Sequence, residues 1–252
     1  MKWRLLIGSI ITAYSLTACQ TTQLSAGAIP QPQSITSLVA EKINQPDLYF
    51  DKTGQYSSTP VKCGFYRKVL GKIKDGGWVV QDFYQDSQTK QTDPIVVFHA
   101  EGLRDFSNDV IDGLVIWYRP DGSRESSTYF MRGKPTDNAM TYDKQGRVRI
   151  VDDLNTDGKT QSLRFYTEAG KLIKQMAEVD GAQEIRYWYS NGKPAVVYKN
   201  DNTEAWDTDG TALPYGQSIY LALYLDSLLY EEKDGSFGNI PSEYKCEQPL
   251  SE

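Results

Sequence analysis

The stretch DLNTDGKTQSLRFYTEAGKL, residues 153–172, holds two turn-forming segments and decides which fold the chain adopts. Its second half ends a strand-like run on Phe165 and Tyr166, and Gly170 follows Tyr166 by four residues. A short polar segment closed by glycine forms a tight hairpin turn, because glycine adopts a positive φ without steric cost. We therefore expect a β-hairpin that turns at Gly170.

The same unit recurs along the chain, as WYRPDGS, TYDKQGR, FYTEAGK, YWYSNGK and AWDTDGT. The aligned glycines are separated by 24, 24, 22 and 18 residues, and an aromatic residue stands four positions before each. The glycines are Gly122, Gly146, Gly170, Gly192 and Gly210, and the aromatic residues are Tyr118, Tyr142, Tyr166, Trp188 and Trp206. Further turns are expected at Arg132-Gly133, Asp157-Gly158, Asp180-Gly181 and Asn200-Asp201. The pattern predicts a mainly β fold, an antiparallel meander of repeated β-hairpins forming an extended sheet.

These aromatic-x-x-x-Gly units resemble the MORN-variant repeats of bacterial lipoproteins and of a family of antitoxins. The resemblance covers residues 113–213, and TYDKQGRV also resembles the YD repeats of large toxin shells. It implies an architecture of stacked hairpins, and the antitoxin relatives imply a possible role as an immunity protein. Residues 44–112 hold only faint copies of the unit, such as the segment from Tyr49 to Gly54.

Helical patterns flank the repeats. Residues 35–43, ITSLVAEKI, predict a short helix, and no glycine or proline interrupts the chain between Gly216 and Gly235. We expect a helix over residues 217–232 that caps the sheet with its apolar residues Ile219, Tyr220, Leu223, Tyr224, Leu225, Leu228 and Leu229.

The first 19 residues have the features of an export signal. Lys2 and Arg4 precede a short apolar run, which is too short to span a bilayer. Leu16-Thr17-Ala18-Cys19 resembles the lipobox of bacterial lipoproteins, which implies cleavage before Cys19 and lipidation of its thiol. Gln20 then favours the outer membrane, facing the periplasm. The domains expected are a signal peptide (1–18), a lipidated linker (19–34), a repeat-containing β domain (35–213) and a C-terminal helix and tail (214–252).

Two further cysteines remain, Cys63 and Cys246. In an exported protein an even pair predicts a disulfide, and two buried free thiols are the alternative.

Charge and composition exclude some classes of partner. The chain has 27 basic and 33 acidic residues, and loss of the leader would leave a net charge of −8. An acidic surface repels nucleic acid, so we expect no nucleic-acid partner. Abundant tyrosine and tryptophan suit a sheet with one wet face.

A metal site is conceivable in the opening stretch. Asp153, Asn155 and Asp157, followed by Gly158, match the first half of a calcium loop. The twelfth position is Arg164, which cannot bind a cation, so the pattern favours a polar turn over a calcium site.

Catalytic patterns are scarce, and we predict neither an enzyme nor a cofactor. The sole histidine, His99, lies on a strand-like run, and nothing singles out a catalytic carboxylate pair, so a hydrolase is a remote alternative. The aromatic residues before the turns are the candidate binding residues, namely Trp117, Tyr118, Tyr166, Trp188 and Trp206. The sequence thus predicts a lipid-anchored, non-catalytic module that binds or scaffolds a periplasmic protein, with immunity against a periplasmic toxin as the alternative.

Overall fold

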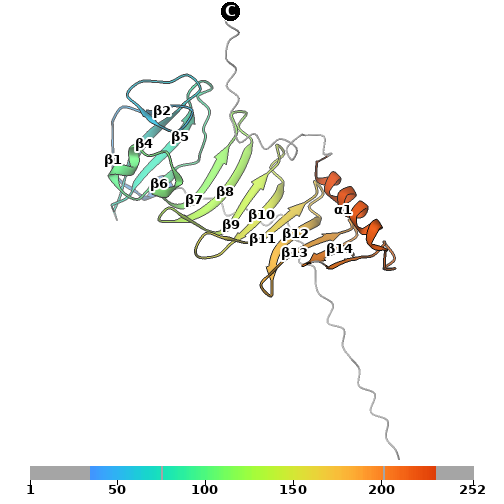
Figure 1. Cartoon of the computed structure of the whole chain (residues 1–252). Helices are drawn as coiled ribbons and strands as arrows, with labels where there is room; N and C mark the ends of the chain where they lie inside the picture. The colour runs from blue at the N-terminus through green and yellow to red at the C-terminus, as the bar shows by residue number, and fades with distance from the viewer. Residues whose placement is uncertain (1–34, 75, 201, 231–252) are drawn as a thin grey trace, which may run out of the picture. The chain divides into compact units, whose positions relative to one another are not determined.

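The computed structural model describes residues 35–74, 76–200 and 202–230. These residues form fifteen β-strands in one antiparallel sheet, followed by one α-helix (Figure 1). From β4 to β15 the strands pair in sequence order, while β1 and β2 both pair with β4 and β3 pairs with β2. The predicted fold class, an antiparallel meander with a C-terminal helix, is confirmed.

The N-terminal region combines two long strands, β4 and β5, with short strands and irregular connections. Its elements are η1 (Ile35–Leu38), β1 (Val39–Lys42), β2 (Leu48–Phe50), β3 (Tyr56–Ser57), β4 (Phe65–Ile73), β5 (Trp78–Tyr84), β6 (Ile95–Val97), η2 (Ala100–Arg104) and η3 (Asn108–Val110). The helix predicted over residues 35–43 is wrong, because only η1 is helical and β1 pairs with β4. A segment of nine residues is too short to hold a helix by itself, so strand pairing decides its conformation.

The repeat region consists of regular hairpins. Its strands are β7 (Ile111–Tyr118), β8 (Arg124–Met131), β9 (Lys134–Tyr142), β10 (Val148–Leu154), β11 (Thr160–Tyr166), β12 (Leu172–Val179), β13 (Ala182–Trp188), β14 (Pro194–Lys199) and β15 (Asn202–Ala205). The helix α1 (Tyr215–Tyr230) follows and contacts β14 and β15 (Figure 1).

The five repeated glycines all have a positive φ, between 71° and 99°. In the turn after β9, Gly146 donates its N–H to the carbonyl of Asp143, and Asp143 donates its N–H to the carbonyl of Arg147. The other four repeated glycines form the same pair of backbone hydrogen bonds. The predicted role of these glycines is therefore confirmed.

A β-bulge follows four of the five repeated turns, three residues after the glycine. One extra residue interrupts the register of four return strands at this position, and these residues are Glu125, Arg149, Ile173 and Ala195. A bulge sets two residues against one on the partner strand and re-aims a side chain. Ile173 and Ala195 are buried in the core, whereas the first two repeats carry charged residues there.

Two apolar cores stabilise the sheet. The first joins β4 to β8 with η2 and η3, through Val69, Val80, Ile95, Val97, Leu103, Val110, Ile111, Val115 and Phe130. The second joins α1 to the last strands, through Ile173, Tyr187, Ala195, Val196, Ala205, Ala222, Leu225 and Leu229. No helix in the described ranges is long and apolar enough to cross a membrane.

Both ends of the chain fall outside the described residues. Lipidation at Cys19, the signal peptide, the linker and the Cys63–Cys246 pairing therefore stay predictions, because Cys19 and Cys246 both lie there.

Candidate binding surfaces

The aromatic residues that precede the turns do not form an exposed row. Tyr166 is buried, and Trp117, Tyr118, Trp188 and Trp206 are half-buried. The Tyr118 hydroxyl donates to Asp93 Oδ2 at 2.8 Å, a contact that fixes it within the sheet. These residues mainly stabilise cross-strand packing, and of the five only Trp117 lines a groove.

The half-motif for calcium forms a hairpin turn. Asn155 Oδ1 accepts hydrogen bonds from the backbone N–H groups of Asp157 and Lys159, both at 2.9 Å. Asp153 Oδ1 pairs with Arg164 Nη2 at 2.5 Å, so the residue at the twelfth position neutralises the first carboxylate. Across the described residues, no group of three or more His, Cys, Asp or Glu side chains could hold a metal ion.

His99 has a structural role in the described region. Its Nδ1 accepts a hydrogen bond from the Gly102 N–H at 2.9 Å and caps η2. The imidazole also meets the ring of Phe98 edge to face, with centroids 4.7 Å apart. These contacts explain why a single histidine stands on this run.

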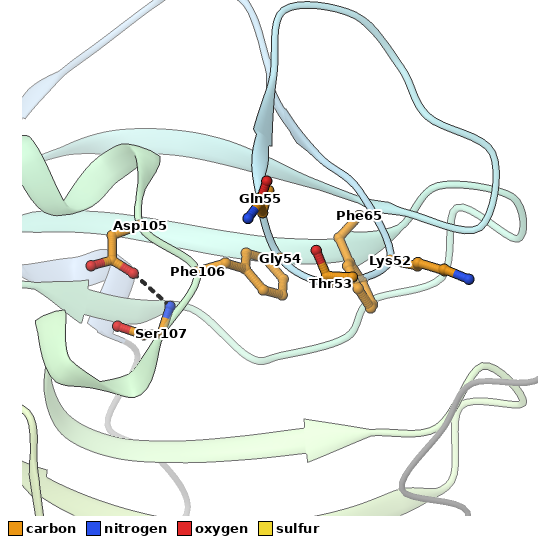
Figure 2. A pocket seen from close by; sticks show the side chains of 8 residues that line it. All are labelled: Lys52, Thr53, Gly54, Gln55, Phe65, Asp105, Phe106 and Ser107. Atoms are coloured by element: carbon orange, nitrogen blue, oxygen red, sulfur yellow. Dashed lines mark hydrogen bonds between the residues drawn. The ribbon is translucent and has the colours of Figure 1, made fainter.

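A small pocket lies in the N-terminal region, with a volume of about 380 Å³ (Figure 2). Phe65 and Phe106 stack at its base, with centroids 4.9 Å apart. Asp105 Oδ1 already accepts the Ser107 N–H at 2.8 Å, as the dashed line in Figure 2 shows. One oxygen of the Asp105 carboxylate in this pocket is therefore engaged in a local turn contact.

A larger groove, of about 700 Å³, crosses the strands from β7 to β11. Aromatic, hydroxyl and carboxylate side chains line it together, from Trp117 and Glu125 to Asp152 and Thr160. Burial raises the pKa of the Glu125 carboxyl; Arg119 opposes this rise and Asp121 adds to it. Sequence analysis missed this groove, because its residues come from five strands and carry no local motif.

The outer face of α1 is the third candidate surface. Five large apolar side chains are exposed there, and these are Tyr215, Ile219, Tyr220, Leu223 and Tyr224. The prediction that the apolar residues of this helix cap the sheet is half wrong. Leu225 and Leu229 are buried against the sheet, whereas Ile219, Tyr220, Leu223 and Tyr224 point to solvent.

Comparisons with known proteins leave the family open. No family model and no curated protein matches the chain. Among solved structures, one similar chain is an S. aureus TarM mutant in complex with fondaparinux, alpha-GlcNAc-glycerol and UDP, at 15% identity and a TM-score of 0.30. Another is the GtfA/B complex bound to UDP and GlcNAc, at 12% identity and a TM-score of 0.23.

The alignment covers 53% of this chain and 21% of the TarM chain, and 46% of this chain and 25% of the GtfA/B chain. The chain thus spans a quarter or less of either protein. TM-scores this low carry no argument about fold or function.

Proposed function

We propose that this chain is a lipid-anchored, non-catalytic binding module of the cell envelope, and that it docks another envelope protein on the outer face of α1. The observation that carries the proposal is the exposure of this helix, where Tyr220 is 76% exposed and Leu223 61%. Exposed apolar patches of this kind mark interaction surfaces, because leaving them in water is unfavourable.

The helix is rigidly held on its inner face. Asp226 accepts hydrogen bonds from Lys174 Nζ at 2.9 Å and from the Tyr187 hydroxyl at 3.0 Å. Leu225 and Leu229 complete the contact by packing into the second core. A surface fixed in this way binds with a smaller loss of conformational entropy, which favours docking.

The chemistry of the outer face suits an apolar partner surface. Asp226 is the sole charged residue of α1, and its bonds to Lys174 and Tyr187 turn it towards the sheet. Tyrosine is enriched in protein interfaces, because its ring buries apolar area while its hydroxyl keeps a polar contact. The partner is therefore expected to present an apolar groove or helix.

The anchoring part of the proposal rests on the lipobox-like segment that ends at Cys19. A lipid at this position would hold the domain at the membrane. Encounters with a partner in the same membrane would then be confined to its surface. Metabolic labelling with a fatty acid should mark the protein, and Cys19→Ser should abolish the label. Label retained by that variant would contradict the anchor without bearing on α1.

Site-specific photo-crosslinking tests the docking surface. A photoreactive residue would replace Tyr220 in the full-length protein in its native cells. The matched control is Tyr129, an equally large side chain that is 46% exposed on β8. We expect one discrete crosslinked species from position 220 and none from position 129.

The identity of the crosslinked species separates the alternatives. An envelope protein whose binding weakens at least tenfold in Tyr220→Ser and Leu223→Ser supports the proposal. A basic toxin would instead identify the chain as an immunity protein, and a crosslinked dimer of purified chain would indicate self-association. Equal crosslinking at both positions, or none at position 220, would contradict a docking role for α1.

A further inference from the structure

The groove across β7 to β11 lies between the two apolar cores. The first core ends at Phe130 in β8, and the second has its first buried member at Ile173 in β12. Its lining includes Asp109, Trp117, Glu125, Phe130, Asp152 and Thr160. Its volume of about 700 Å³ falls within the range of small-molecule sites.

The repeat itself shows that the floor of the groove is specialised. At the bulge position the later repeats place Ile173 and Ala195, both buried apolar residues of the second core. The first repeat places Glu125 there, and Ser126 follows it in the groove. Of the four bulge residues, Glu125 alone lines the groove, because Arg149, the bulge residue of the second repeat, is buried outside its lining.

One hydrogen-bond acceptor of the groove is buried without a donor among the described residues. Asp152 Oδ2 accepts the Thr160 hydroxyl at 3.0 Å, but Asp152 Oδ1 is buried and has no donor among the described residues. Glu125, a second carboxylate of the groove, is partly buried, and this burial raises the pKa of its carboxyl. A buried acceptor without a donor is costly, so a ligand that brings O–H groups would be stabilised here.

An aromatic side chain accompanies these acceptors. Trp117 packs edge to face on Phe130, with centroids 6.0 Å apart and planes at 77°. That contact fixes the orientation of the indole at the groove. A fixed indole offers an apolar surface on which the C–H face of a sugar ring can stack.

We propose that this groove binds a neutral oligosaccharide, with Trp117 stacking on a sugar ring and Asp152 accepting its hydroxyl groups. Anionic ligands are disfavoured, because the described lining residues include three carboxylates and no lysine or arginine. The side chains of Ser126, Thr128 and Thr160 both donate and accept, as a polyol requires. The apolar members, such as Pro135 and Leu154, suit the alternating C–H surface of a sugar better than a chain of amines.

Isothermal titration of the mature chain tests the site. The probes are maltotetraose, cellotetraose and tri-N-acetylchitotriose, and spermidine is added as a cationic comparison. We expect at least one saccharide to bind. Trp117→Ala and Asp152→Ala should each weaken that binding about tenfold, the effect of losing roughly 1.4 kcal/mol. Trp206→Ala is the matched control, because Trp206 is half-buried before a turn but does not line the groove.

Thermal melting of each variant shows whether it is folded. If Trp117→Ala does not fold, Trp117→Phe and Asp152→Asn replace the truncations, since both keep most of the side-chain volume. Failure of all three saccharides to bind would overturn the proposal. The proposal would also be overturned if a saccharide bound but none of the groove variants changed its affinity. It would likewise be overturned if spermidine alone bound and high salt abolished that binding.

Discussion

The N-terminal region, β1 to β6, and the repeat region, β7 to β15, belong to one sheet but are stabilised by different contacts. In the repeat region a glycine turn and its bulge recur in successive hairpins. In the N-terminal region the segment from Asp51 to Gln55 forms such a turn, with Gly54 at a φ of 82°, and the same pair of backbone hydrogen bonds joins Ile73, Gly76 and Gly77 between β4 and β5. The faint copy seen in the sequence is therefore a true copy of the turn.

A buried ion pair also stabilises the N-terminal region. Arg67 bonds Asp82 through two parallel contacts, Nε to Oδ1 at 2.7 Å and Nη2 to Oδ2 at 2.9 Å. Arg67 Nη1 also donates to the carbonyls of Gly102, Leu103 and Asp105, which fastens η2 to the sheet. The repeat region is organised by a recurring turn and bulge, whereas the N-terminal region adds to its apolar core a buried ion pair that joins β4, β5 and the η2 segment.

The largest expected effect comes from breaking that ion pair. Arg67→Met leaves Asp82 buried without its partner and frees three carbonyls of the η2 segment. We expect a loss of about 3–5 kcal/mol in the free energy of unfolding, measured by urea denaturation. A loss under about 1 kcal/mol would show that the pair does not organise this region.

A cavity in the second core should have a somewhat smaller effect. Leu225 is 2% exposed, and Leu225→Ala should cost about 2–5 kcal/mol. The control is Leu223→Ala on the outer face of α1, which should change stability by less than about 0.5 kcal/mol. Equal losses in the two variants would mean that both faces of the helix are packed.

Two glycine substitutions compare the turn at Gly133, which contacts η3, with the turn at Gly122, which has no neighbour at that position. A Cβ on Gly133 would lie 2.1 Å from the Asp109 carbonyl oxygen of η3, whereas a Cβ on Gly122 would meet nothing within 4 Å. Both have a positive φ, at 81° and 84°. Gly122→Ala should cost about 1–2 kcal/mol from backbone strain alone, and Gly133→Ala clearly more. Equal melting temperatures for the two variants would contradict the close contact with η3.

The smallest effect concerns Glu125 and its pH dependence. Because its pKa is raised in the folded state, the folded chain binds a proton more readily than the unfolded chain. The charged carboxylate therefore destabilises the fold above that pKa, and this penalty disappears as the pH falls below the unfolded value. Glu125→Gln should melt at a higher temperature than the native chain at pH 7 and at the same temperature near pH 3. A variant that melts lower at pH 7 would contradict the desolvation of Glu125.

Features encoded by a few adjacent residues were predictable from the sequence. The turns at Gly122, Gly146 and Gly170 follow from an aromatic residue, a polar segment and a glycine, so they gave the meander directly. The bulge at Glu125 was not predictable, because a bulge exists only in the register between two strands. The turn expected at Asp157-Gly158 forms as well, with the same pair of backbone hydrogen bonds as the repeated turns.

Longer-range features could not be derived from the sequence. In α1 both Leu223 and Leu225 are apolar, so periodicity alone does not show which one faces the sheet. The groove joins Trp117 to Asp152 from strands that only the fold brings together. The sequence also did not show which aromatic residues before the turns are exposed. Tertiary packing decides this, and it buries Tyr166.

Hydroxyl-radical footprinting in the native envelope tests the central claim, docking on the outer face of α1, most directly. Oxidation of Tyr220 and Tyr224 would be compared between intact envelopes and the purified chain, with Tyr129 as the internal reference. The account predicts that Tyr220 and Tyr224 are protected in the envelope and reactive in the purified chain, while Tyr129 reacts equally in both. Equal oxidation of Tyr220 and Tyr224 in both preparations would contradict it.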